Sequence, residues 1–347
     1  MRTGLTVAAA MLVAGCSDGL PQAATDGPRI EASLERVIER SSAPAREAAF
    51  SRDGTLLATT SANGAVTIRR TGDWRRVASF THPGGATSAD FAADGRRLFT
   101  GGYDGAVRAW DVASGRPAEA LQGAQGTVWT VDVSPDDKKV AAAGEDKLVR
   151  VWTLGSAAPP QQLGGHQRNI WEARFSPDGS HLASGSFDNQ ARIWNLATGK
   201  TERVLKGHSQ AVVGLAYSPD GKLIATAGDD STVRLWRSAD GALLRTLNNG
   251  NHGYKVTFSP DGRWLVSAGR ARGAIGTFWH QLSGGGGRAA PVHLWRVSDG
   301  AFLQALPHPD DVIYAGFSPD GTRLVTAGED GTVRLWRIRE VSGRRAK

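Results

Sequence analysis

The sequence predicts an all-β fold built from seven copies of one unit, and three observations support this prediction. A five-residue phrase recurs as FSRDG, FAADG, VSPDD, FSPDG, YSPDG, FSPDG and FSPDG. Successive copies are 41, 42, 42, 42, 41 and 59 residues apart. Beyond residue 40, short runs of alternating β-branched and polar residues are bounded by Gly, Asp and Pro, and no stretch has the apolar period of a helix. The aspartates of the phrase are Asp53, Asp94, Asp136, Asp178, Asp220, Asp261 and Asp320.

A second register accompanies the first, because a short strand ends 16 residues after most of these aspartates. It ends in Arg69 in the first unit and in tryptophan in the others. The tryptophans are Trp110, Trp152, Trp194, Trp236, Trp295 and Trp336. Trp295 follows its aspartate by 34 residues, so the sixth unit carries 18 additional residues between its second and third strands.

These phrases and tryptophans resemble the WD40 repeat family over residues 31–340. The resemblance implies a propeller of seven blades, each a four-stranded antiparallel sheet. The seventh unit supplies only three strands before the chain ends. We therefore expect the segment from Ser33 to Glu39 to supply the fourth strand of the last blade and close the ring.

The resemblance also implies a buried polar network in each blade, made of a His, a Ser or Thr, an Asp and the Trp. Four units contain all four residue types. They are His82, Thr100, Asp104 and Trp110; His166, Ser184, Asp188 and Trp194; His208, Thr226, Asp230 and Trp236; and His308, Thr326, Asp330 and Trp336. A hydrolase triad uses similar groups. Four equivalent sets at the repeat spacing are better explained as structural networks, in which every buried polar group has a partner.

The other three units depart from the pattern. The third has Ala124 and Ala142 in place of the His and the hydroxyl, and keeps Asp146 and Trp152. The corresponding residues of the first unit are Ser41, Thr59, Asn63 and Arg69, and those of the sixth are Asn249, Ser267 and Trp295. We expect these three blades to depend more on apolar packing.

The first 16 residues, MRTGLTVAAAMLVAGC, have the character of an export signal. The apolar run is too short to span a bilayer and suits a secretory signal peptide over residues 1–15. Val13 to Cys16 resembles the bacterial lipobox, after which the cysteine is lipidated, with palmitate among the acyl groups expected. Cys16 is the single cysteine of the chain. The alternatives are an ordinary cleaved signal and a buried free cysteine.

Lipidation of Cys16 would place the protein on a bacterial membrane, on its periplasmic side or at the cell surface, because several acyl chains anchor a protein stably. Residues 16–30 then form the lipidated terminus and a linker, residues 31–340 the propeller and residues 341–347 a basic tail. The formal net charge is +7. Export argues against a nucleic-acid partner, and an anionic lipid, a cell-wall polymer or a plain solvated surface accounts for this charge.

Two positions in each unit are expected at the rim opposite the SPDG turns, through which members of this family commonly bind. One lies seven residues before each SPDG aspartate, and the other just before each turn aspartate of the network. The aromatic residues at these positions are Trp129, Trp171, Tyr254, Tyr103 and Phe187. They predict an aromatic patch, since large aromatic side chains anchor interfaces. The alternative is packing between blades.

The insertion, at about residues 270–291, is a second candidate for binding because long loops on rigid scaffolds often carry function. Phe278, Trp279 and His280 lie between glycines there. Its glycines lack the GK[ST] ending of a phosphate loop. His181, His252, His280 and His293 have no spacing that indicates a metal site, and we find no catalytic constellation.

The sequence thus predicts a monomeric, lipid-anchored scaffold in the bacterial envelope that binds other proteins and has no catalytic activity, cofactor or metal. The alternative is a small-molecule-binding or enzymatic propeller that uses the channel mouth and the insertion loop. The sequence does not identify the partner, because one fold hosts many functions.

Overall fold

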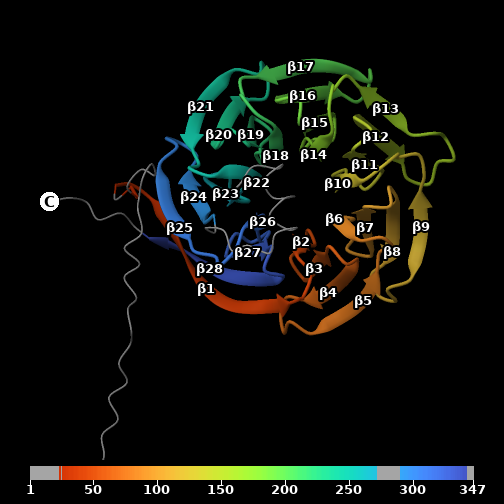
Figure 1. Ribbon diagram of the computed structural model, residues 1–347, viewed down its shortest axis with the longest axis horizontal. Helices are drawn as coiled ribbons and strands as arrows, with labels where there is room; N and C mark the ends of the chain where they lie inside the picture. The colour runs from red at the N-terminus through yellow and green to blue at the C-terminus, as the bar shows by residue number, and fades with distance from the viewer. Residues whose placement is uncertain (1–22, 25, 272–289, 342–347) are drawn as a thin grey trace, which may run out of the picture.

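The computed structural model describes residues 23, 24, 26–271 and 290–341. These residues form 28 strands in seven four-stranded antiparallel sheets. The sheets are arranged radially around a central axis (Figure 1). This confirms the prediction of an all-β, seven-bladed propeller. The described residues include no helix long and apolar enough to cross a membrane.

Each blade is a meander that runs from the channel outward, so its four strands occupy four concentric positions (Figure 1). The inner strands of blades 1 to 7 are β2 (Ala45–Phe50), β6 (Ala86–Phe91), β10 (Val128–Val133), β14 (Ile170–Phe175), β18 (Val212–Tyr217), β22 (His252–Phe258) and β26 (Val312–Phe317). The second strands are β3 (Leu56–Ser61), β7 (Arg97–Gly102), β11 (Lys139–Gly144), β15 (His181–Ser186), β19 (Leu223–Gly228), β23 (Trp264–Arg270) and β27 (Arg323–Gly328). The third strands are β4 (Ala65–Arg70), β8 (Val107–Asp111), β12 (Leu148–Thr153), β16 (Gln190–Asn195), β20 (Thr232–Arg237), β24 (Val292–Arg296) and β28 (Thr332–Val341). The outer strands are β5 (Arg76–Thr81), β9 (Pro117–Leu121), β13 (Gln161–Gly164), β17 (Lys200–Lys206), β21 (Leu243–Asn248), β25 (Phe302–Leu306) and, in blade 7, β1 (Arg29–Arg40).

Blade 7 contains both the first and the last strand of the described chain. Its strand order is β1-β28-β27-β26, and β1 pairs with β28 from Arg29 opposite Val341 to Arg40 opposite Thr332. The segment from Ser33 to Glu39 lies within β1. The amide of Gln304 in β25 also exchanges two hydrogen bonds, of 2.8 and 2.9 Å, with the backbone of Ala32.

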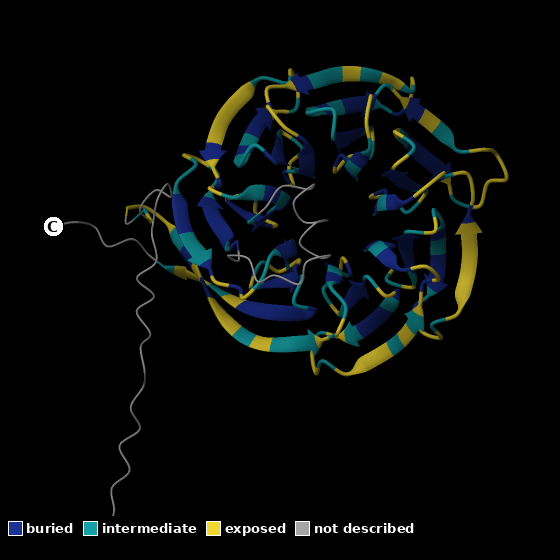
Figure 2. Ribbon diagram, in the orientation of Figure 1, coloured by how far each residue is buried: buried dark blue, intermediate teal, exposed yellow. Residues whose placement is uncertain are grey.

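The hydrophobic core lies between neighbouring blades, where the faces of adjacent sheets meet. Ile193 and Leu205 of blade 4, for example, pack with Val212, Leu215 and Ile224 of blade 5. Burial is greatest in the second and third strands and lowest in the outer strands (Figure 2). The apolar residues at alternate positions of each strand therefore hold each blade against its two neighbours.

The SPDG phrases form the tight turns between inner and second strands. In blade 4, the Ser176 hydroxyl donates to the Asp178 carboxylate at 2.5 Å. Gly179 has a φ of +69°, and a Cβ there would lie 3.6 Å from Pro135 of the preceding turn. Glycine suits this turn because a side chain at such a φ is strained.

Two residues that depart from the SPDG phrase form hydrogen bonds between the turns of blades 1, 2 and 3. Arg52 replaces the proline of the first turn, and its guanidinium donates to the carbonyl oxygens of Val133, Ser134 and Pro135 at 2.8–3.0 Å. Asp137 replaces the glycine of the third turn. Its carboxylate accepts hydrogen bonds from the backbone N–H groups of Ala93, at 2.6 Å, and Asp94, at 3.2 Å.

The four-residue network is complete in blades 2, 4 and 5. In blade 4, Trp194 Nε1 donates to Ser184 Oγ at 2.8 Å, Ser184 Oγ lies 2.8 Å from His166 Nε2, and His166 Nδ1 lies 2.8 Å from Asp188. The Trp236, Thr226, His208 and Asp230 set repeats this order in blade 5. The Trp110, Thr100, His82 and Asp104 set is likewise connected in blade 2.

In blade 7 the predicted network differs at one member. Trp336 and His308 both contact Thr326, as expected. His308 Nδ1, however, donates to the carbonyl of Leu306 at 3.0 Å, and Asp330 pairs with Arg334 at 2.5 Å. The prediction of a complete network in this blade is therefore wrong at Asp330, because a backbone carbonyl satisfies the histidine and an arginine satisfies the aspartate. Burial lowers the pKa of His308 to about 4, so the ring is neutral at pH 7.

The irregular blades replace the missing groups with others. In blade 6, Trp295 Nε1 donates to Ser267, Ser267 donates to Asn249, and the buried His293 lies 3.2 Å from the same amide oxygen. In blade 3, Trp152 Nε1 donates to the carbonyl of Gln122. In blade 1, Thr59 donates at 2.7 Å to Glu39, which comes from β1.

Candidate binding surface at the channel mouth

A β-bulge occurs near the start of every inner strand. The pairing of each inner strand with its second strand skips one residue, which therefore has no partner opposite it. The skipped residues are Arg46, Thr87, Trp129, Trp171, Val213, Tyr254 and Ile313. They are the residues seven positions before the SPDG aspartates. Each blade thus contributes one bulged side chain, and six of the seven line the cavity at one mouth of the channel.

The aromatic residues at this mouth form one continuous set, which we call the aromatic cluster. Trp129 and Trp171 stack with ring centroids 4.5 Å apart and planes 15° apart. The edge of Tyr103 meets Trp129 at 5.7 Å. Tyr254 and Phe187 meet Trp171 at 5.7 and 5.3 Å. All five side chains are partly exposed.

The structure therefore brings together the five aromatic residues that the sequence selected. The stack of Trp129 on Trp171 also joins blades 3 and 4, so packing between blades and an accessible aromatic surface occur together. Such edge and stacked contacts hold large rings in fixed positions. Fixed rings lose little conformational entropy when a partner binds.

Ion pairs complete the mouth beside the aromatic cluster. Arg46 lies 3.2 Å from Glu329, which follows the second strand of blade 7. Arg270 lies 2.8 Å from Asp229, and its guanidinium lies 4.8 Å from the ring centroid of Tyr254. The polar part of the mouth is thus made of paired charges of opposite sign.

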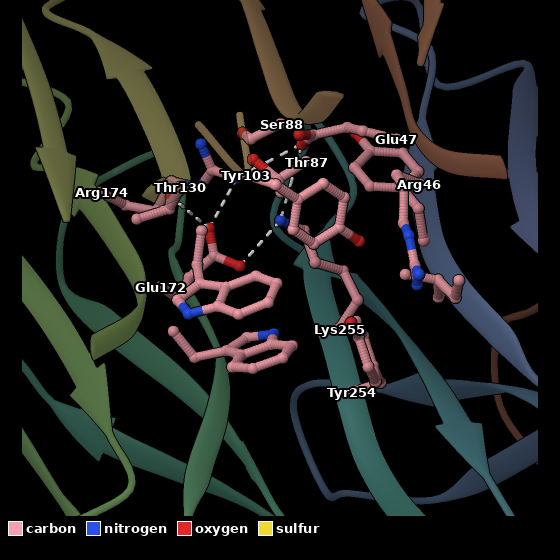
Figure 3. Close-up of a pocket in the computed structure, with 14 residues that line it drawn as sticks. Arg46, Glu47, Thr87, Ser88, Tyr103, Thr130, Glu172, Arg174, Tyr254 and Lys255 are labelled. Atoms are coloured by element: carbon pink, nitrogen blue, oxygen red, sulfur yellow. Dashed lines mark hydrogen bonds and ion pairs between the residues drawn. The ribbon is translucent and has the colours of Figure 1, made fainter. Parts of the chain in front are cut away.

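A network of charged side chains lines the same cavity as the aromatic cluster (Figure 3). Lys255 lies 2.8 Å from Glu172 and 3.8 Å from Glu47. Arg174 lies 2.6 Å from Glu172, 3.0 Å from Asp132 and 3.5 Å from Glu47. A cavity of about 40 Å³ remains among these groups and the rings above them.

Carboxylates of this network also connect neighbouring inner strands. Glu47 accepts from Ala89 N at 2.8 Å, Asp90 from Val133 N at 2.8 Å and Asp132 from Phe175 N at 2.7 Å. Inner strands of adjacent blades are not paired with each other in a sheet. These bonds therefore satisfy backbone groups that face the channel.

Two of these carboxyl groups have raised pKa values. Burial and the neighbouring Asp132 raise the pKa of Asp90 to about 7. Burial also raises the pKa of Asp132, and Arg174 opposes this effect. Among the described residues of this network, the four carboxyl groups of Glu47, Asp90, Asp132 and Glu172 outnumber the cations Arg174 and Lys255, and Arg52 also acts on Asp90.

This network was not predicted from the sequence, although the inner strands carry a signal for it. Charged residues occur inside inner strands that are otherwise apolar, as in VWTVDV and IWEARF. Glu47, Glu172 and Lys255 each follow the bulged residue of their strand. Charges at one register of several repeats therefore indicate a common environment, which here is the channel.

Comparison with known families agrees with this architecture. A family model described as "WD domain, G-beta repeat", the WD40 repeat, matches residues 74–111, 115–153, 158–195, 199–237, 241–272 and 300–337. The chain belongs to the WD40-repeat family. Propellers of this kind are generally scaffolds for protein interactions.

The unmatched parts of this WD40 propeller include its irregular regions. They contain β1 to β4, where Arg69 stands in place of a tryptophan, and the insertion in blade 6. Among curated proteins, a "Coronin-like protein" of Saccharomyces cerevisiae is 45% identical over 49 residues. The match covers 14% of this chain and 8% of that protein, so this chain spans less than a tenth of its relative.

Other predicted residues of the WD40 propeller lie outside the described residues. They are Cys16, Phe278, Trp279 and His280. The ends of the insertion are described, since the backbone N–H groups of Ala271 and Ala290 lie 2.8 and 3.4 Å from Asp311 Oδ1. Across the described ranges, no three His, Cys, Asp or Glu side chains gather as metal ligands would. His181 pairs with Glu202, and His252 with the carbonyl of Asp229.

Proposed function

We propose that this WD40 propeller is a non-catalytic scaffold of the bacterial envelope, anchored by lipid on Cys16, that holds a partner protein at the channel mouth. The observation that carries the proposal is the aromatic cluster around the stacked Trp129 and Trp171. Tryptophan and tyrosine dominate the energetics of many protein interfaces.

The size of the channel cavity favours a protein partner over a small molecule. Sites for drug-sized ligands usually enclose about 300–1,000 Å³. The cavity at this mouth holds about 40 Å³, because Lys255, Arg174 and their carboxylate partners occupy the space below the rings. A surface placed above a filled channel suits the side chains of another protein.

The path of the amino-terminal segment is compatible with a lipid anchor. Ala24 N donates to the carbonyl of Phe302 at 2.8 Å, and Arg296 donates to the carbonyls of Asp26 and Pro28 at 2.7 and 2.9 Å. These contacts hold the segment at the outer edge of blade 6. An anchor attached there leaves the channel mouth accessible to a partner.

Affinity capture of the full-length protein from its own membranes tests the scaffold function. We expect Trp171→Ala to reduce the captured partner about tenfold or more, because a central aromatic anchor contributes more than about 1.4 kcal/mol. Leu243→Ala is the matched control. It removes a 46% exposed apolar side chain from β21, on the outer surface of blade 5.

Equal amounts of partner captured by the Trp171→Ala and Leu243→Ala proteins would contradict the proposal that the partner binds at the channel mouth. A small molecule that copurifies with the wild-type protein and is lost from the Trp171→Ala protein would instead support the alternative of a ligand-binding propeller.

A further inference from the structure

A groove of about 640 Å³ lies between blades 4 and 5, at the opposite end of the inner strands from the aromatic cluster. Ile193 and Tyr217 line its apolar part, and Pro177 and Pro219 of two successive SPDG turns flank it. Its polar lining includes three carboxylates, those of Asp178, Glu202 and Asp220. A groove of this volume can hold a short peptide segment.

Tyr217 is the single tyrosine at its position in the seven repeats. The corresponding residues of the other blades are Phe50, Phe91, Val133, Phe175, Phe258 and Phe317. The Tyr217 hydroxyl is buried and has no hydrogen-bond partner among the described residues. A phenylalanine would avoid the cost of this unsatisfied group, so the hydroxyl calls for a partner from outside.

Three carboxylates and Arg203 line the groove, in a chain whose net charge is +7. Asp220 pairs with Lys222 at 3.5 Å. Glu202 is already paired, with Arg203 at 2.6 Å and with His181 at 2.7 Å. Asp178 accepts from Ser176 and Ser180, and within the described ranges it has no lysine or arginine partner. These hydrogen bonds lower the pKa of Asp178 to about 2, so the group is ionised at neutral pH.

The groove between blades 6 and 7 shows what such an aspartate can bind. Asp261 occupies the position of Asp178 there, and the guanidinium of Arg263 lies 2.6 Å from it. Arg263 also pairs with Glu340. In blade 4 the residue equivalent to Arg263 is Ser180, which carries no charge. Within the described ranges, the chain thus supplies an arginine to Asp261 in one groove, whereas in the other groove Arg203 pairs with Glu202 and Asp178 has no arginine partner.

We propose that the groove between blades 4 and 5 binds an arginine-bearing peptide segment of a partner protein. The guanidinium pairs with Asp178, and the aliphatic part of the arginine packs on Ile193 and the ring of Tyr217. The Tyr217 hydroxyl hydrogen-bonds to the same segment. This site is independent of the channel mouth and of lipidation.

Fluorescence anisotropy with the full-length protein tests the proposal. The probe is a labelled peptide Gly-Ala-Leu-Arg-Leu-Ala-Gly, and its control carries citrulline, which is uncharged, in place of arginine. We expect the citrulline peptide and the Asp178→Asn protein each to show binding about tenfold weaker, because a charge-assisted hydrogen bond is lost. Tyr217→Phe should weaken binding severalfold, because the peptide loses the hydroxyl as a hydrogen-bond partner.

Asp53→Asn is the matched control. Asp53 accepts from Ser51 and from the backbone and hydroxyl of Thr55, at 2.6, 3.0 and 2.8 Å, so it forms the same turn in blade 1. Asp53→Asn and Trp171→Ala should leave peptide affinity unchanged.

Absence of binding to the wild-type protein, equal binding of the two peptides, or equal affinities of the Asp178→Asn and Asp53→Asn proteins would each overturn the proposal. Should Asp178→Asn fail to fold, the Tyr217→Phe protein and the citrulline peptide decide the question, since neither alters the turn. Unchanged affinity in both would also overturn it.

Discussion

Asp90 lies in β6 beside the channel, where its carboxyl group accepts from Val133 N and faces Asp132 of the next blade. Its pKa of about 7 exceeds the ordinary value of an aspartate near 4. Between these two pH values the folded protein keeps a proton that the unfolded chain has released. The free energy of unfolding therefore falls as the pH rises from about 4 to about 7.

Asp90→Asn removes this dependence, because the amide is neutral and its oxygen still accepts from Val133 N. We expect the variant to exceed the wild type in free energy of unfolding by as much as about 4 kcal/mol at pH 8, and by progressively less toward pH 5. Urea unfolding at pH 5, 6, 7 and 8 measures the difference. Asp73→Asn, in a surface turn, is the control and should leave the pH dependence unchanged. A constant difference at all four pH values would show that Asp90 is ionised throughout.

Asp188 belongs to the blade 4 network, where it is the acceptor of a fully buried histidine. Asp188→Ala leaves His166 Nδ1 without a partner, so we expect the free energy of unfolding to fall by about 1–3 kcal/mol. Glu202→Ala removes the same kind of histidine–carboxylate pair, at 2.7 Å from His181, on the surface. That control should change stability little, because water replaces the lost partner. Similar losses in the two variants would argue against a special role for the buried network.

Among elements, β1 connects three blades. It pairs with β28 along blade 7, exchanges hydrogen bonds with Gln304 of blade 6, and places Glu39 against Thr59 of blade 1. Glu39 also lies 3.6 Å from Arg69, and Arg69 occupies the position at which other blades have a tryptophan. The strand thus contributes to stability well beyond its own sheet.

Deletion of residues 31–40 should lower the midpoint of thermal unfolding by about 10 °C or more, because it exposes the edge of β28 and removes contacts with two further blades. Circular dichroism during heating measures the midpoint. Leu34→Ser is the control within the same strand, since Leu34 is 51% exposed, and it should change the midpoint little. An unchanged midpoint in the deletion would mean that the ring does not depend on β1.

The repeat register explains why the strands and the aromatic positions were predictable. Residues at the same register of each unit occupy the same place in each blade, so the spacing of the SPDG phrase locates both inner strands and their bulged residues. The register does not reveal partners that come from other blades. Glu39 with Thr59 and Arg174 with Glu47 are pairs of this kind.

His293 illustrates a different limit of sequence reasoning. It stands two residues before Trp295, where five other units have arginine. It enters the blade 6 network because Asn249 occupies the position of the usual histidine and offers an amide oxygen. Such an exchange of roles between two positions depends on three-dimensional contact. It was therefore not predictable from either position alone.

At the scale of the whole molecule, the proposed functions use different faces. The aromatic cluster and the groove of Asp178 lie at opposite ends of the inner strands, and the amino-terminal segment runs along the outer edge of blade 6. A membrane anchor at that edge would leave both ends of the channel accessible. One propeller could then hold two partners at once near the membrane.

The anchor is tested by Cys16→Ser, with Ser17→Ala as the neighbouring control. We expect the wild-type and Ser17→Ala proteins to incorporate labelled palmitate and to occur in the membrane fraction. Several acyl chains hold a protein on a bilayer where one does not. The Cys16→Ser protein should lack the label and leave the membrane fraction. If the wild-type protein is exported but soluble and unlabelled, the first residues act as an ordinary cleaved signal. The two binding surfaces would stand in that case, since neither depends on lipid, but the scaffold would no longer be confined to the membrane.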